Sequence, residues 1–135
     1  MIMRQIDNYI NGELSRPASL RYLDNFNPAE GKVYATIPDS DGSDVASAVD
    51  AATKAFHEWA DMSAEKRAVI LLRIADLIDR DGDKLALAES IDSGKPVALA
   101  KRLVIPRACA NLRFFATAAI HFSSEAHVTG KEAIN

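Results

Sequence analysis

One short segment, Leu85–Pro96, requires a helix to stop and another to begin within a dozen residues. Leu85, Ala88 and Ile91 recur at helical spacing. Gly94 stands where the helix is expected to end, because a residue without Cβ adopts the left-handed conformation at no steric cost. Pro96 has no N–H and cannot continue that helix, but it is tolerated in the first turn of the next one. The segment therefore predicts a corner with helices on both sides.

Residues 1–40 predict two short β-hairpins. Asn11 and Gly12 both tolerate positive φ, so they predict the tight turn of the first hairpin. The second hairpin is expected from Tyr22–Asn27, a turn that ends in glycine, and the alternating run Lys32–Ile37. Two short hairpins are weak structures alone, so we expect them to lie against something larger.

Residues 41–125 follow the spacing of amphipathic helices. Ser43 is expected to cap the first helix and Ser63 the second. The first helix carries an apolar stripe made of Val45, Ala48, Val49, Ala52, Phe56 and Trp59. The second carries a wider face made of Ile70, Leu71, Ile74, Leu77 and Ile78, flanked by Val69 and Leu72. We expect this second helix to be the most buried, with Ile74 and Leu77 in the core.

A last helix is predicted from about Pro96 to Ser124, with a break near Val104 because Pro106 removes a hydrogen bond and clashes with the preceding turn. Beyond the break the expected apolar face consists of Ala108, Leu112, Phe115, Ala116, Ala119 and Phe122. Residues 126–135 are interpreted as the start of an unfinished strand. The sequence thus predicts one α+β, predominantly helical segment over residues 1–135, with two hairpins followed by four to five amphipathic helices.

Composition limits the classes of partner. A net charge of −3 gives no electrostatic reason to expect nucleic acid or an anionic membrane. The single Cys109 excludes an internal disulfide and fits a reducing compartment. We found no apolar run long enough to span a bilayer and no signal peptide. The expected location is the cytoplasm, with no membrane and no nucleic acid as partner.

The search for a phosphate or metal site gives a negative expectation. The sequence contains no glycine-rich phosphate-binding loop. Its histidines are His57, His121 and His127, and the last two with Glu125 could be imagined as metal ligands. Zinc sites usually present three or four converging ligands in a recognised spacing, so we interpret these as polar residues at a helix end.

The remaining candidates for catalysis also have simpler interpretations. Cys109 lies in the middle of an apolar helix, where a small buried side chain is expected rather than a nucleophile. Glu89 and Asp92 are three apart, which is typical of a solvated helix face and not specific to an acid–base pair. Lys95, beside Gly94, could hold an anion, but the helix dipole also favours a lysine there. We therefore predict no catalytic, cofactor-binding or metal-binding residue.

Several stretches resemble the aldehyde dehydrogenase superfamily and together cover nearly the whole chain. They are Tyr9–Glu13 (YINGE), Asn27–Val33 (NPAEGKV), the run Asp44–Trp59, the run Arg67–Asp76, and Leu85–Pro96 with its L-A-x-x-E-x-x-D-x-G-K-P pattern. Ile105–Arg107 and Leu112–Ala116 are similar to a narrower branch, the semialdehyde dehydrogenases of hydroxymuconate and aminomuconate breakdown. Val104 departs from the pattern, since related members often carry an acidic residue there that is associated with a structural monovalent cation. That departure puts cation binding in doubt.

The resemblance implies the N-terminal segment of an NAD(P)-dependent enzyme that oxidises an aldehyde, such as a muconic-type semialdehyde, to a carboxylate. It also implies that the family's catalytic cysteine, glutamate and asparagine, and its NAD- or NADP-binding strands, lie beyond Asn135. The 135-residue chain is then expected to be inactive alone and to bind no cofactor. Its partners would be the remainder of the dehydrogenase or another copy of itself, in a homo-oligomer. The alternative is a free-standing helical module that keeps the packing surface and binds a protein.

Overall fold

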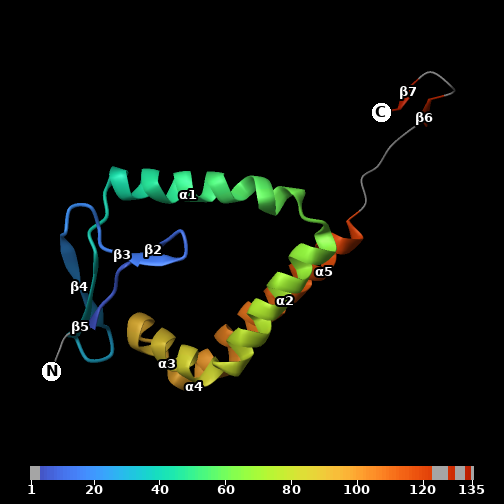
Figure 1. Ribbon diagram of the computed structural model, residues 1–135. Coiled ribbons are helices and arrows are strands. Elements are labelled where there is room, and N and C mark those ends of the chain that lie inside the picture. Colours follow the sequence, from blue (N-terminus) through green and yellow to red (C-terminus); the bar gives the residue numbers. More distant parts are fainter. Residues whose placement is uncertain (1–3, 123–127, 130–132, 135) are drawn as a thin grey trace.

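The computed structural model describes residues 4–122, 128–129 and 133–134. The N-terminal strands gather at one end of the molecule, and the helices extend away from them toward β6 and β7 (Figure 1). The expected α+β class, with strands preceding a larger helical part, is confirmed.

Five strands form the N-terminal part, and two of them close the first predicted hairpin. Their bounds are β1 (Arg4–Gln5), β2 (Asn8–Ile10), β3 (Glu13–Ser15), β4 (Tyr22–Asn27) and β5 (Lys32–Pro38). β2 pairs antiparallel with β3, and the turn residues Asn11 and Gly12 have φ of 54° and 82°. Both positions of the turn are thus left-handed, as predicted.

The second hairpin belongs to a three-stranded sheet of order β1-β5-β4. β4 pairs antiparallel with β5, and β1 joins the other edge of β5 in parallel. We did not predict β1, which is only two residues long. The ladder shifts between Asn25 and Phe26, so that Asn25 faces Ala35 while Phe26 faces Val33. Tyr34 is the extra residue of this β-bulge.

The helices begin and end close to the predicted positions. Their bounds are α1 (Gly42–Asp61), α2 (Ala64–Arg80), α3 (Gly82–Ser93), α4 (Val97–Leu99) and α5 (Ile105–His121), with a π-helical turn, η1 (Ala100–Val104), between the last two. Ser63 caps α2 through the backbone N–H of Lys66, as predicted. Gly94 ends α3 with φ 75°, also as predicted.

The predicted cap of α1 is wrong. The N-cap is Asp41, whose carboxylate accepts from the backbone N–H of Ser43. Asp44 reaches back to the N–H of Asp41 at 3.0 Å, which completes a capping box. An acidic side chain two residues earlier therefore takes the role that we expected of Ser43.

Pro106 changes the helix without breaking it. The backbone N–H of Ile105 bonds the carbonyl of Ala100, five residues back, so the chain widens by one π turn before the proline. The irregularity lies where a break was expected, but the helix continues through it to His121. Ser124, the expected end, lies outside the described residues, as does Asn135. β6 (Val128–Thr129) pairs with β7 (Ala133–Ile134).

One expectation about membranes needs correction. Among the described residues, the continuous helix Val97–His121 is long and apolar enough to cross a bilayer, with a mean hydropathy of 1.3. A mostly buried core helix can meet the same criterion, whereas 11% of this apolar window is buried within the described residues. Arg113, within this helix, pairs with Asp76 and Asp79 of α2, which fits packing of this helix on α2.

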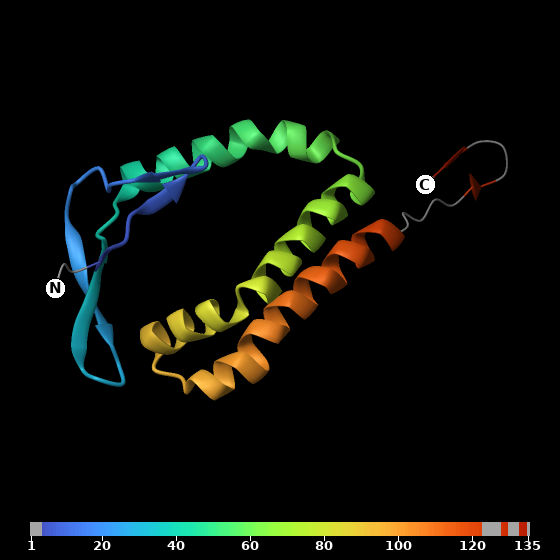
Figure 2. The ribbon, with the colours of Figure 1, turned by 60° about the horizontal axis from the view of Figure 1, so that its bottom comes forward.

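α2 and α5 lie side by side and antiparallel (Figures 1 and 2). Small residues seven apart fill the contact between them. Ala68 and Ala75 on α2, and Cys109 and Ala116 on α5, are each no more than 2% exposed. Side chains of this size let two helices approach closely.

The expected core is wrong in part for the same reason. Ile74 is 40% exposed, and Leu77 is only half-buried. Of the predicted α5 face, Ala116 is buried and Leu112 is half-buried, whereas Phe115 is 64% exposed and Phe122 is 84% exposed. Because α2 and α5 pack through small residues, most of the large apolar side chains at these positions are left facing outward.

Candidate functional site

Cys109 is a buried thiol between two helices. It is 1% exposed, and its Sγ donates to the carbonyl oxygen of Ala75 at 3.6 Å. Burial raises the pKa of the Cys109 thiol, and the nearby Asp79 carboxylate raises it further. The thiol form is therefore favoured over the nucleophilic thiolate. The buried position agrees with the prediction.

The carboxylates of Glu89 and Asp92 bind different partners and do not form an acid–base pair. Glu89 forms an ion pair with Lys95 at 2.5 Å. Oδ1 of Asp92 instead accepts hydrogen bonds from the Tyr34 hydroxyl at 2.6 Å and from Nδ2 of Asn25 at 2.9 Å. These hydrogen bonds, that of Tyr34 first, lower the pKa of Asp92. Asp92 is held as an ionised acceptor, which does not suit a general acid.

The two histidines that the structure describes lie on different helices. His57 lies in α1 and His121 is the last residue of α5. Glu125 and His127, the other imagined ligands, lie outside the described residues. Within residues 4–122 and the two short strands, no group of three or more metal-ligating side chains comes together. The absence of a metal site remains a prediction. Val104, the position that departs from the cation pattern, ends the π turn and is half-buried.

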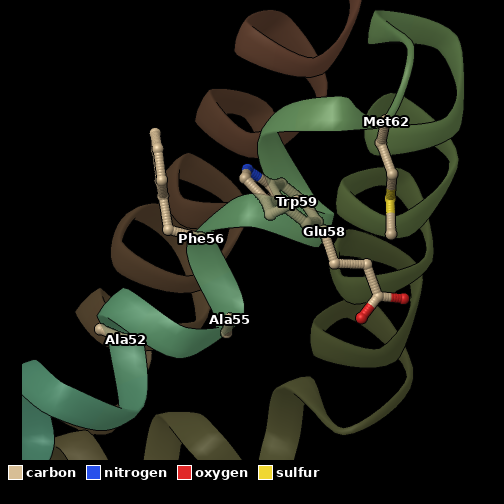
Figure 3. A pocket seen from close by; sticks show the side chains of 6 residues that line it. All are labelled: Ala52, Ala55, Phe56, Glu58, Trp59 and Met62. Carbon is tan, nitrogen blue, oxygen red and sulfur yellow. The ribbon is translucent and has the colours of Figure 1, made fainter.

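An apolar hollow lies at the C-terminal end of α1 (Figure 3). It encloses about 420 Å³ and is lined by Ala52, Ala55, Phe56, Glu58, Trp59 and Met62. In this view the Trp59 indole lies between Phe56 and Met62. Phe56 is 60% exposed and Trp59 is 38% exposed. Aromatic rings and a thioether bind apolar side chains well, and a single carboxylate offers little for catalysis. The hollow is therefore better suited to binding an apolar side chain of another protein than to catalysing a reaction.

A larger cleft is lined by residues of β1 and β5 on one side and of α2, α3 and α5 on the other. It encloses about 640 Å³. Its lining includes Ile6, Ile78, Leu85, Ile91 and Ile105, together with the polar residues Arg4, Tyr34, Glu89 and Asp92. Three of these polar groups already have partners, because Asp92 accepts from Tyr34 and Glu89 pairs with Lys95. Most of the cleft lining is therefore apolar, and both of its carboxylates already have partners.

Two features that organise these surfaces were missed from the sequence. Arg67 donates from Nη1 to the carbonyl of Met62 and, at 3.4 Å, to that of Trp59, so it closes the end of α1 from the first turn of α2. Tyr34 and Asn25 join the sheet to α3 through Asp92. Nothing in the local spacing of an arginine, a tyrosine or an asparagine signals such distant partners.

Comparison with known proteins decides the family. The sequence profile of the Aldehyde dehydrogenase family matches residues 15–134. The chain belongs to the aldehyde dehydrogenase family.

Curated relatives within this family include two muconic semialdehyde dehydrogenases. The 2-aminomuconic semialdehyde dehydrogenase of Bos taurus is 41% identical over 120 residues, which are 89% of this chain and 24% of the relative. The 2-hydroxymuconic semialdehyde dehydrogenase of Pseudomonas sp. (strain CF600) is 39% identical over 125 residues, 92% of this chain and 26% of the relative. The resemblance to this branch, seen in the sequence, is confirmed.

Solved structures of the family share the fold of this segment. A variant of aldehyde dehydrogenase from Bacillus cereus matches with a TM-score of 0.92 and 29% identity, over 97% of this chain and 27% of that one. An indole-3-acetaldehyde dehydrogenase in complex with NAD⁺ matches with a TM-score of 0.91 and 26% identity, over 98% of this chain and 27% of that one. The chain thus spans about a quarter of the length of the proteins it matches.

Proposed function

We propose that these residues form the N-terminal part of an NAD(P)-dependent aldehyde dehydrogenase that oxidises an aldehyde to a carboxylate. Family membership and the NAD⁺ held by a structural neighbour support the reaction and the cofactor. The two muconic semialdehyde dehydrogenases among the relatives favour a muconic-type semialdehyde as substrate. In this enzyme the segment acts as a helical scaffold on which the rest of the protein packs.

One observation carries this role: the described residues bury only small apolar side chains. The buried apolar residues are Pro17, Ala35, Ala68, Ala75, Ala86, Ala100, Cys109 and Ala116. Large apolar side chains lie open instead, including Val45, Val49 and Phe56 on the stripe of α1, each at least 56% exposed. Apolar surface of this extent is unusual on a free monomer and marks a surface that another protein part covers.

The segment itself supplies no catalytic group in this proposal. Cys109 is buried with a raised thiol pKa, which opposes a role as the family's nucleophile. The sequence contains no glycine-rich phosphate-binding loop. The 135-residue chain alone is therefore proposed to be inactive and to bind neither NAD nor NADP.

Complementation tests the scaffold role. The purified chain would be mixed with the Pseudomonas relative lacking its matching N-terminal quarter, and formation of reduced nicotinamide followed with the semialdehyde. We expect turnover only when both parts are present. Phe56→Asp, on the exposed stripe, should abolish complementation, whereas Lys54→Asp, a polar position of the same helix, should preserve it. Turnover by the chain alone, or a Phe56→Asp variant that complements fully, would overturn the proposal.

A second candidate function rests on the hollow beside Trp59. An open apolar hollow with two aromatic side chains also fits a free-standing interaction module. Such a module would bind a protein partner without restoring activity to the truncated relative. Failure of complementation together with stoichiometric binding of another protein, lost in Phe56→Asp, would favour this alternative.

The same open faces support a second copy of the chain as partner. We expect the isolated chain to associate as a symmetric dimer through its helices, because an isologous contact buries one patch on both copies at once.

A further inference from the structure

The C-terminal end of α3 contacts the β4–β5 hairpin through one carboxylate oxygen. Oδ1 of Asp92 accepts from the Tyr34 hydroxyl at 2.6 Å and from Nδ2 of Asn25 at 2.9 Å. Nδ2 of Asn25 also lies 3.0 Å from the Tyr34 hydroxyl. Side chains from β4, β5 and α3 thus close a triangle, although Asp92 is 58 residues from Tyr34 and 67 from Asn25 in sequence.

The bulge in β5 prepares the hairpin for this contact. Tyr34 is the residue that the shift in register leaves without a partner on β4. A bulge bends its strand and re-aims a side chain. Here the re-aimed residue is the one that reaches across to α3.

Gly94, two residues after Asp92, provides a second contact. A Cβ placed on Gly94 would lie 3.0 Å from Cβ of Pro28, in the turn of the same hairpin. Gly94 also has φ 75°, which a residue with a side chain adopts only under strain. The glycine therefore ends α3 and at the same time allows the hairpin turn to approach.

These two contacts lie where the sheet meets the helices. Of all contacts between the three-stranded sheet and a helix in the described residues, that between β4 and α3 is the most extensive. Both ribbon views show the hairpin turn close to the end of α3 (Figure 2). The large cleft lies between β1 and β5 of the sheet and the helices α2, α3 and α5, and both Tyr34 and Asp92 line it.

We propose that Asp92, Tyr34 and Gly94 form a latch that sets the angle between the three-stranded sheet and the helices. Asp92 is its positioning residue, because one oxygen of its side chain holds both strands of the hairpin. β1 is carried along, since it pairs only with β5 in this sheet. The latch gives Asp92 and Gly94 a structural role in this chain, and this proposal does not depend on the proposed enzyme function.

A distance measurement tests the latch directly. Spin labels would be placed at Glu30 in the hairpin turn and at Leu87 on α3, both exposed, in a Cys109→Ala background that leaves no other thiol. Labelled chain would be diluted into an excess of unlabelled chain, so that measured distances are intramolecular. We expect a narrow distribution in the parent and a broad one in Asp92→Ala and Tyr34→Phe. Asp92→Asn should recover the narrow distribution, because its amide oxygen still accepts from the tyrosine.

Tyr22 provides a matched control. Its hydroxyl donates to Oδ1 of Asp7 at 2.6 Å, the same length and chemistry, but within the strand region of the chain. Tyr22→Phe should leave the Glu30–Leu87 distance unchanged. A narrow parent-like distribution in both Asp92→Ala and Tyr34→Phe, or equal broadening in Tyr22→Phe, would overturn the latch. Should Asp92→Ala not fold, Tyr34→Phe decides alone, since it removes a single oxygen.

Discussion

Sγ of Cys109 on α5 lies 3.6 Å from the carbonyl oxygen of Ala75 on α2. The two residues lie in the contact of an antiparallel helix pair that packs through small side chains. Both are no more than 1% exposed, so a larger side chain at either position would clash with its neighbours. The best-packed part of this segment is therefore the contact between α2 and α5, made by Ala68, Ala75, Cys109 and Ala116 and called the seam below. The large apolar residues of the segment lie outside this seam.

A larger side chain in the seam should reduce the free energy of unfolding more than truncation of an exposed side chain beside it. Ala75→Leu forces extra atoms into a filled contact, and we expect a loss of about 1–3 kcal/mol in the free energy of unfolding. Ile74→Ala, one residue away but 40% exposed, should cost less than the roughly 2–5 kcal/mol typical of a buried isoleucine. Urea denaturation of both variants at one protein concentration checks the order. The reverse order would place Ile74 in a core that the structure does not show.

Arg67 should hold the last turn of α1 in place. Its guanidinium donates to the carbonyls of Met62 and Trp59 at the end of α1, and the Trp59 carbonyl also accepts from the backbone N–H of Met62. Losing the arginine bonds in Arg67→Met should cost about 0.5–1.5 kcal/mol. Hydrogen exchange should be faster at the end of α1 and unchanged at the start of that helix. Arg73→Met, at an exposed arginine of α2, serves as the control. Equal protection of the last α1 turn in both variants would contradict a capping role for Arg67.

Removing the Tyr34 hydroxyl should raise the pKa of Asp92 toward the ordinary aspartate value. The hydrogen bond from Tyr34 is the largest cause of the lowered pKa. A folded-state pKa below the unfolded one means that the carboxylate stabilises the fold above the unfolded pKa. That contribution is lost as the pH falls through the folded pKa. Carbon NMR titration of the side-chain carboxyl in Tyr34→Phe measures the change.

The pKa of Asp7 provides the control for this titration. Tyr22 is the first cause of its lowered pKa, followed by Gln5. Tyr22→Phe should therefore raise the pKa of Asp7 and leave that of Asp92 unchanged, while Tyr34→Phe should do the opposite. If Tyr34→Phe left the Asp92 titration where it was, the hydrogen bond between them would not exist in solution.

Local turn chemistry was the most predictable part of this chain. The conformations of Asn11, Gly12 and Gly94 follow from which residues tolerate positive φ, and all three were correctly predicted. The cap of α1 was misplaced because Asp41 and Ser43 both have the chemistry of a cap, and only the fold decides between them. The family resemblance was equally visible, because it rests on short motifs spread along the chain.

The packing could not be predicted from periodicity alone. Helical spacing shows that a face is apolar, but it does not show what lies against that face. Ala68, Ala75, Cys109 and Ala116 form the seam because small side chains permit the closest approach, whereas the apolar pattern pointed to Ile74 and to the α5 face with Phe115 and Phe122. The partners of Asp92 were equally hidden, since they are brought to it by a bulge and a sheet that form elsewhere in the sequence.

The isolated chain should show no dehydrogenase activity and no NAD binding. The proposed enzyme draws its nucleophile and its cofactor site from residues beyond this segment. An assay with NAD and a panel of aldehydes, combined with calorimetric titration of NAD, checks both expectations. Reproducible turnover would show that catalytic groups are present in the 135 residues after all.

The central claim is that the large apolar faces of this segment form a packing surface that the segment itself does not cover. Sedimentation equilibrium over about a hundredfold range of concentration tests it most directly, because mass action shifts any self-association across that range. We predict a monomer–dimer equilibrium that Phe56→Asp weakens and Lys54→Asp does not, with binding of a dye specific for apolar surface at low concentration. A clean monomer mass throughout, without dye binding, would contradict the claim.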